Sequence, residues 1–66
     1  MRILVIGGGG REHSLCWAIS ASQLCESLYC ATGNAGIKNI AECVPISAED
    51  TDNLLLFAIK KQFDFV

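Results

Sequence analysis

The sequence predicts an α/β chain that begins an open parallel sheet, with its elements in the order β-α-β-α-β. A β-branched apolar run at residues 2–6 leads directly into four glycines at residues 7–10 and then into a segment with helical spacing. A second glycine-containing loop, residues 33–36, follows a second apolar run. The hydrophobic fraction of the 66 residues is 52%, which is typical of buried parallel strands.

The first half of the chain reads as a strand, a helix and a strand. The helix is expected over residues 11–22, with Glu12 in its first turn, where a carboxylate interacts favourably with the helix dipole. Its positions at helical spacing are Leu15, Ala18, Ile19 and Ser22. The second strand is expected over residues 27–31, and a right-handed crossover places it beside the first strand.

The second half predicts one more helix and two short extended pieces. Residues 37–41 suggest a single helical turn, and residues 43–46 an extended piece that Pro45 restricts to a sheet edge or to no sheet. A helix is expected from a cap at Asp50 or Thr51 to about Gln62. Its expected apolar face consists of Leu54, Phe57, Ala58 and Ile59. Residues 63–66 read as a strand that has only just begun, so we expect a third strand cut short.

Composition argues against several classes of partner. The net charge is −2 and the five Lys and Arg residues are scattered, so no nucleic-acid surface is expected. No apolar run approaches the roughly 18 residues that a membrane helix needs, and no membrane partner is expected. The start of the chain lacks the apolar core of a signal peptide, so a cytoplasmic location is predicted.

Four cysteines in so short a chain raise the question of a disulfide or zinc site. Cys16, Cys25, Cys30 and Cys43 form no C-x-x-C pair, and His13 stands at no ligand spacing from them. We therefore expect small buried hydrophobic residues and no metal ligands, with a reactive thiol or an unforeseen metal site as the open alternatives.

The first glycine turn invites comparison with dinucleotide-binding loops. The G-x-G-x-x-G pattern would place its third glycine on Glu12 or on His13, depending on where it starts, and both side chains are too large for that position. The second strand also ends without the acidic residue that binds a ribose hydroxyl. No G-K-[S/T] is present, which excludes a Walker A loop.

The two glycine loops remain as a candidate anion site. Both follow strands, and ligands of open parallel sheets gather at the carboxyl ends of the strands. Their backbone N–H groups suit one phosphorylated ligand. Arg11, Glu12 and His13 stand beside the first turn. Each also has an ordinary structural interpretation. Arg11 can be a solvated residue of the first turn, Glu12 an acid that interacts with the helix dipole, and His13 a capping or packing group.

Two stretches of the chain resemble one enzyme family. Residues 3–17 contain Gly-Gly-Arg-Glu-His followed by Ser-Leu, and residues 31–36 read Ala-Thr-Gly-Asn-Ala-Gly. This pair is similar to the opening of the phosphoribosylamine–glycine ligases (glycinamide ribonucleotide synthetases), and the likeness spans essentially all 66 residues. Thr32 stands where that family usually has proline, and Ser14 where alanine is commoner.

The resemblance implies a reaction and a site. The family joins phosphoribosylamine to glycine with ATP and a divalent metal, Mg or Mn, in purine synthesis, through a glycyl phosphate that the sugar amine attacks. By carry-over, one side of the sugar-phosphate site consists of Gly8, Gly9, Gly10 and Arg11. The facing loop consists of Gly33, Asn34 and Gly36. Glu12 and His13 are expected to orient the turn, and no catalytic residue or metal ligand is expected within these residues.

The resemblance also implies a domain organisation. Residues 1–66 correspond to part of a Rossmann-like pre-ATP-grasp domain, without the ATP-grasp and C-terminal domains, so this segment alone is expected to be inactive. ATP and the metal ion would be bound outside it. Two alternatives stay open at this point: a small NAD-type dinucleotide-binding module, and a structural fragment without a ligand.

Overall fold

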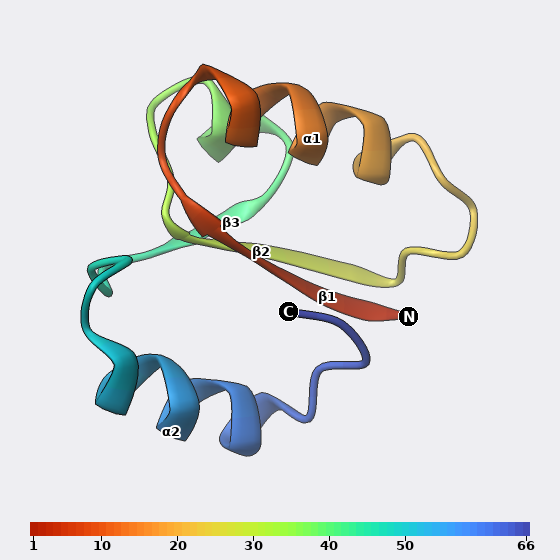
Figure 1. Cartoon of the computed structure of the whole chain (residues 1–66). Coiled ribbons are helices and arrows are strands. Elements are labelled where there is room, and N and C mark those ends of the chain that lie inside the picture. Colours follow the sequence, from red (N-terminus) through yellow and green to blue (C-terminus); the bar gives the residue numbers. More distant parts are fainter.

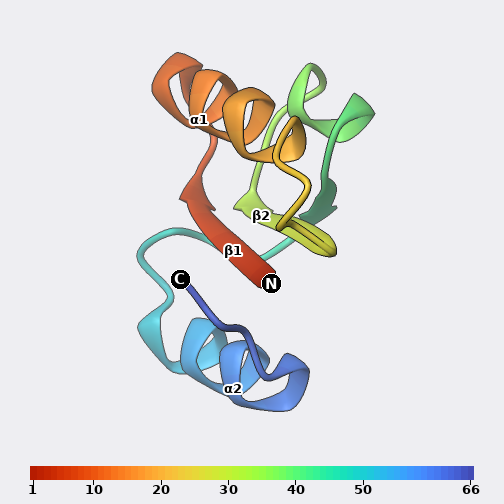
Figure 2. The ribbon, with the colours of Figure 1, turned by 90° about the vertical axis from the view of Figure 1, so that its right-hand side faces the viewer.

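A parallel sheet with one helix on each face forms the centre of the molecule (Figures 1 and 2). The computed structural model describes all residues, 1–66. The elements in chain order are β1 (Arg2–Gly7), α1 (Gly10–Ser20), β2 (Ser27–Thr32), the 3-10 turn η1 (Ile37–Asn39), β3 (Glu42–Val44) and α2 (Thr51–Lys61). The predicted α/β class and the order β-α-β-α-β are confirmed.

The sheet has the strand order β1-β2-β3, and both pairings are parallel. The register of β1 and β2 runs from Arg2 opposite Ser27 to Gly7 opposite Thr32, so the expected pairing of the first two strands is confirmed. β3 lies at the edge and ends just before Pro45. Proline has no backbone N–H to donate to a neighbouring strand, which explains why the pairing stops there.

Alternating side chains divide the sheet into two apolar faces, as strand geometry requires. The cluster on the α1 face consists of Val5, Cys16, Leu28, Cys30 and Ile37. The cluster on the α2 face consists of Leu4, Ala31 and Leu54. Each helix contributes one buried side chain to the core, Cys16 from α1 and Leu54 from α2.

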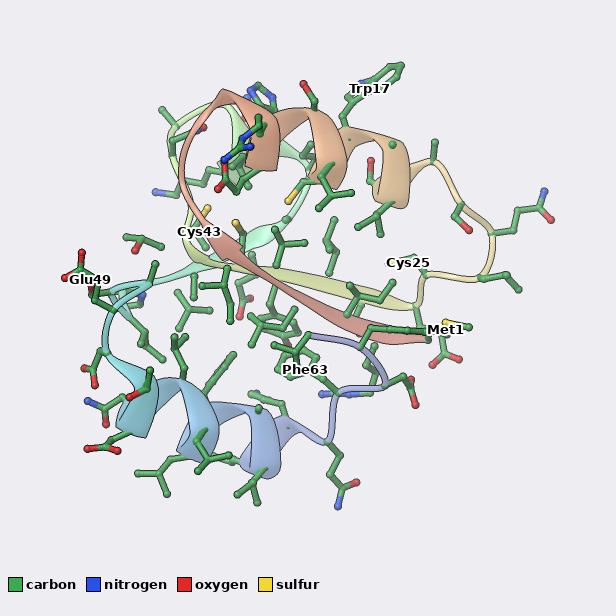
Figure 3. All side chains as sticks on the ribbon, viewed as in Figure 1. Met1, Trp17, Cys25, Cys43, Glu49 and Phe63 are labelled. Carbon is green, nitrogen blue, oxygen red and sulfur yellow. The ribbon has the colours of Figure 1, made fainter.

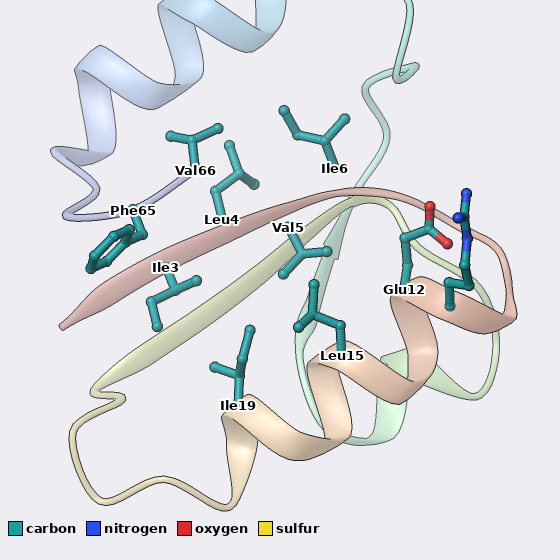
Figure 4. A pocket seen from close by; sticks show the side chains of 10 residues that line it. Ile3, Leu4, Val5, Ile6, Glu12, Leu15, Ile19, Phe65 and Val66 are labelled. Carbon is teal, nitrogen blue, oxygen red and sulfur yellow. The ribbon is translucent and has the colours of Figure 1, made fainter.

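The residues at helical spacing in the first helix match only in part the face that α1 buries, because Ile19 alone among them is partly buried against the core. Cys16 is completely buried, whereas Leu15 is 51% exposed, Ala18 is exposed, and Ser22 lies beyond the end of α1. Leu15 and Ile19 point toward the open edge of β1, where they line a surface hollow with residues of that strand (Figure 4). The spacing pattern favoured the larger apolar residues, but the position of α1 over the sheet places a small thiol at the point of closest contact.

The second helix begins as predicted. Asp50 caps it, because its carboxylate accepts a hydrogen bond of 3.3 Å from the backbone N–H of Asn53. Leu54 is buried and Phe57 and Ala58 are partly buried, but Ile59, expected on the same face, is 64% exposed. Ile59 follows Leu54 by five residues, and an α-helix turns by about 100° per residue. Ile59 therefore points well away from the side on which Leu54 is buried.

The segment after α2 is held against the sheet. The rings of Tyr29, Phe57 and Phe63 form a cluster with centroids 5.3 to 5.8 Å apart (Phe63 is labelled in Figure 3). Phe65 forms one parallel bridge with Ile3, on the edge of β1 opposite β2. The strand expected to begin at residues 63–66 is thus present as a single parallel bridge.

The four cysteines are all free thiols, and two of them are buried in the core. Cys30 donates a hydrogen bond from its sulfur to the carbonyl oxygen of Gly7, at 3.2 Å. Burial raises the pKa of the Cys30 thiol from 9.0 to about 12, and burial also raises the pKa of Cys16. Cys25 and Cys43 are only partly buried. The expectation of small buried hydrophobic residues therefore holds for Cys16 and Cys30.

This burial predicts a loss of stability at alkaline pH. Above pH 9 an unfolded Cys30 loses its proton, whereas the folded thiol keeps it up to about pH 12, so the folded state binds more protons in that window. The free energy of unfolding should fall as pH rises through it, by at most about 1.4 kcal/mol per pH unit for this thiol. Denaturant unfolding at pH 8 and pH 10.5 measures the fall. It should be smaller in Cys30→Ala, and an equal fall in both proteins would contradict the assignment.

Candidate functional site: two joined glycine loops

Both glycine loops lie at the carboxyl ends of neighbouring strands. Residues 7–10 connect β1 to α1, and residues 33–36 connect β2 to η1 (Figure 1). Because β1 and β2 are parallel and Gly7 pairs with Thr32, the two loops leave the sheet side by side. The structure therefore brings together the two segments that the sequence singled out.

Hydrogen bonds join the two loops directly. The N–H of Gly33 donates to the carbonyl oxygen of Gly7 at 3.0 Å. The side-chain amide of Asn34 donates to the carbonyl oxygen of Gly8 at 2.7 Å. The amide oxygen of Asn34 accepts a hydrogen bond of 2.9 Å from the N–H of Ile37. Asn34 thus ties the second loop both to the first loop and to the start of η1.

Neither Gly8 nor Gly33 has room for a side chain, for two different reasons. A Cβ atom on Gly8 would lie 2.6 Å from the carbonyl oxygen of Gly33. Gly33 has a φ of +78°, which favours glycine, and the sulfur of Cys43 lies directly against it. Gly8 is therefore required by the close approach of the two loops, and Gly33 by its backbone conformation and its contact with Cys43.

Two side chains from the first turns of α1 pack onto the loops. The Glu12 carboxylate lies against Gly7, and one of its oxygens would be 3.2 Å from a Cβ atom on Gly9. The His13 ring covers Gly36, with Nδ1 at 3.0 Å from where a Cβ atom would stand. No side chain caps the N-terminus of α1. The first-turn N–H groups of α1 consequently have no side-chain acceptor.

Gly10 and Arg11 differ from the other predicted site residues. Nothing lies within 4 Å of a Cβ atom placed on Gly10, and both residues are exposed. Arg11 lines a hollow of about 530 Å³ at the open edge of β1, together with Glu12 (Figure 4). The hollow beside the second loop, about 270 Å³, does not include Arg11. The structure thus joins Gly7 and Gly8 to Gly33 and Asn34. Arg11 lies apart from this junction, in the hollow at the edge of β1.

Lys38 is a residue of this region that the sequence analysis did not identify. It lines the 270 Å³ hollow together with Gly33 and Asn34. Its N–H donates to the carbonyl oxygen of Asn34 at 3.0 Å, so the turn after the loop fixes its position. The sequence did contain a signal for Lys38. It stands four residues after Asn34, within a predicted helical turn, so its charge could be expected near the second loop.

The surroundings of the joined loops carry charges of both signs. Free N–H groups at a helix start, the positive end of the α1 dipole and the cations Arg11 and Lys38 attract negative charge, whereas the Glu12 carboxylate lies against Gly7 and Gly9. No group of three or more His, Cys, Asp or Glu side chains is arranged to hold a metal ion. Neither helix is long and apolar enough to cross a membrane.

Comparison with known proteins agrees with the resemblance of the two loops. The family described as "Phosphoribosylglycinamide synthetase, N domain" matches residues 1–66. The phosphoribosylamine–glycine ligase of Caldanaerobacter subterraneus subsp. tengcongensis is 50% identical over 64 residues, which cover 97% of this chain and 15% of that enzyme. The ligases of Brucella melitensis and Agrobacterium fabrum are 50% and 47% identical over all 66 residues, which are 16% of each enzyme.

The chain thus spans about one sixth of the length of the curated relatives it matches. Within that span, the family match covers both glycine loops and every element of the fold. The chain therefore belongs to the phosphoribosylglycinamide synthetase family, and residues 1–66 match the model of its N domain.

Proposed function

We propose that this chain is the N-terminal segment of an ATP-dependent ligase that joins phosphoribosylamine and glycine to give glycinamide ribonucleotide in de novo purine synthesis. The observation that carries the proposal is the pair of joined glycine loops in a chain that matches the family's N domain over its whole length. The names of the relatives support a ligase, and the anion-binding geometry supports a phosphorylated substrate.

In this proposal the loops bind the ribose phosphate. The N–H groups of Gly8, Gly9 and Gly10 face the phosphate, and Arg11 adds a positive charge at its rim. The facing wall consists of Gly33, Asn34 and Gly36, with Lys38 as a second cation. Glu12 and His13 are positioning residues, because they pack against the glycines of the two loops.

The remaining chemistry is assigned outside residues 1–66. ATP, with Mg²⁺ or Mn²⁺, activates the glycine carboxylate in the family's reaction, and the residues described above bind and orient the sugar phosphate. The segment alone is accordingly proposed to be inactive. Its substrates are phosphoribosylamine, glycine and ATP, without nucleic acid or membrane partners. Because these phosphorylated compounds are retained inside cells, the proposal places the protein in the cytoplasm.

An NAD-type module receives no support from the structure or the relatives. Glu12 or His13, depending on where the pattern starts, occupies the position where the dinucleotide fingerprint requires a small residue, and both side chains pack onto glycines of the loops. The relatives compared above are ligases. We therefore keep the sugar-phosphate assignment.

Gly10 offers a direct test of the phosphate site. A chimera would carry this chain in place of the matching segment of the Brucella melitensis ligase, to which it is 50% identical. The site at Gly10 is open, so Gly10→Leu should fold normally while its side chain obstructs the phosphate. We expect the KM for phosphoribosylamine to rise about tenfold or more, with the KM for ATP within about twofold of the parent.

The matched control for this experiment is Ala18→Leu, which introduces the same side chain at an exposed position farther along α1. It should leave all KM values unchanged. An unchanged KM for phosphoribosylamine in Gly10→Leu would show that the phosphate does not bind at this turn.

Asn34 tests the junction of the loops. Asn34→Ala removes the hydrogen bonds to Gly8 and Ile37, each worth about 1 kcal/mol, and should raise the KM for phosphoribosylamine in the chimera. Asn34→Asp keeps the acceptor for Ile37 but sets a carboxylate against the carbonyl oxygen of Gly8 and beside the proposed phosphate, so its KM should rise at least as much as that of Asn34→Ala. Asn39→Ala, at an exposed position of η1, is the control. Equal KM values in all three variants would show that the junction does not shape the substrate site.

A further inference from the structure

The sheet has an open edge along β1, on the side opposite β2. A hollow of about 530 Å³ follows this edge, and apart from Arg11 and Glu12 its lining is apolar. Residues 3–6 of β1 form its floor, with Leu15 and Ile19 of α1 on one side and Phe65 and Val66 on the other (Figure 4). We call this hollow the β1-edge groove.

The segment after α2 already pairs with the first half of this edge. The N–H of Leu4 donates to the carbonyl oxygen of Phe65 at 3.0 Å. The N–H groups of Asp64 and Phe65 donate to the carbonyl oxygen of Arg2 at 2.8 and 3.3 Å, and the Asp64 carboxylate accepts a hydrogen bond of 2.7 Å from the N–H of Arg2. Phe65 therefore stands opposite Ile3 in a parallel bridge, which fixes the direction and register of a strand on this edge.

The second half of the edge presents backbone groups without a strand partner. Alternate residues of a parallel strand direct their N–H and C=O groups to the same side. Because the N–H of Leu4 points to Phe65, the carbonyl oxygen of Leu4 and the N–H of Ile6 also point to that side, beyond the single bridge. An extended chain carries a donor and an acceptor at the matching spacing.

The α1 side of the groove presents apolar side chains that nothing covers. Leu15 and Ile19 are four residues apart and therefore lie on one side of the helix. Leu15 is 51% exposed and Ile19 only partly buried, although both point toward β1 (Figure 4). The side chains of a further strand beside β1 would bury both residues and complete the apolar face of α1.

We propose that the β1-edge groove binds a further parallel β-strand of the same ligase, contributed by the part of the enzyme outside residues 1–66. This inference rests on the proposed function, because the chain covers only 15% to 16% of the ligases that it matches. The strand runs on from Phe65 in the register of the bridge. Its second residue after Phe65 pairs with the carbonyl oxygen of Leu4 and the N–H of Ile6. It is apolar, as expected for a strand with a helix over each face.

A small molecule suits this groove less well than a strand does. The volume is large enough for a ligand, but ligand pockets place several polar groups around a bound molecule. The polar side chains here are Arg11 and Glu12, which carry opposite charges. A small molecule would also leave the row of backbone groups on β1 without partners.

The strand brings a third loop to the candidate site. Because it runs parallel to β1, its carboxyl end lies beside Gly7, and the segment that follows it lies beside Arg11. Arg11 thus lies between the first glycine loop and this further loop. Its place in the β1-edge groove, apart from the hollow of the second loop, has the same explanation.

The test uses the full-length chimera with the Brucella melitensis ligase and the variants Leu15→Cys and Ser14→Cys. Ser14 is the matched control, because it is exposed on the same helix at the neighbouring position. In native chimera, iodoacetamide should label the thiol introduced by Leu15→Cys at least about 100-fold more slowly than the one introduced by Ser14→Cys. In denaturant the two rates should be equal. Peptide fragmentation separates the introduced thiol at position 15 from Cys16, which is 0% exposed.

Hydrogen exchange of the Ile6 amide tests the backbone pairing. In the unsubstituted chimera this amide should exchange at least about 100-fold more slowly than an unpaired amide. The protection should not change when the protein is diluted about tenfold, because the strand belongs to the same molecule.

Three results would overturn the inference. Equal labelling of Leu15→Cys and Ser14→Cys in native chimera means that the groove is open. Slow labelling of Leu15→Cys with fast exchange at Ile6 means that something other than a strand covers it. Protection that falls on dilution means that a second copy covers it.

These results are distinguishable from a failure of the proposed function. An open groove in a chimera that still forms glycinamide ribonucleotide contradicts the strand alone. A protected groove in an inactive chimera contradicts the ligase function alone.

Discussion

The parallel pairing of β1 with β2 is the constraint on which the rest of the structure depends. It aligns Gly7 with Thr32, and so brings the ends of both strands, and the loops that follow them, to one edge of the sheet. A slip of one residue would separate the N–H of Gly33 from the carbonyl oxygen of Gly7. It would also turn every β2 side chain to the opposite face. The register therefore determines the core and the candidate site at once.

The candidate site is built mainly from backbone. Gly8 lies so close to the backbone of Gly33 that it cannot carry a side chain, and Asn34 is the one side chain that bridges the loops. Support comes from outside the loops: His13 packs on one side, and Cys30 and Cys43 lie beneath. Because backbone groups cannot be exchanged by substitution, the surrounding side chains are where the protein can adjust the geometry of this site.

The sequence predicted which helices and strands form better than it predicted which side of each helix is buried. The strands, the cap at Asp50 and the glycine loops depend on residues close together in the chain, and these predictions agree with the structure. The helix faces depend on where each helix lies over the sheet. Leu15 and Ile59 fitted an apolar period yet are exposed, whereas Cys16 is completely buried. Periodicity selects a range of angles around a helix, and packing decides which of them meets the sheet.

The sequence by itself determined the α/β class, the two loops and the family resemblance, because glycine runs and strand patterns are local signals. Only the tertiary structure decided that Asn34 binds Gly8 across 26 positions, that Cys43 supports Gly33, and that Lys38 rather than Arg11 shares the hollow of the second loop. These contacts join residues far apart in the sequence. They exist only because strand register and helix placement bring separate segments to the same edge of the sheet.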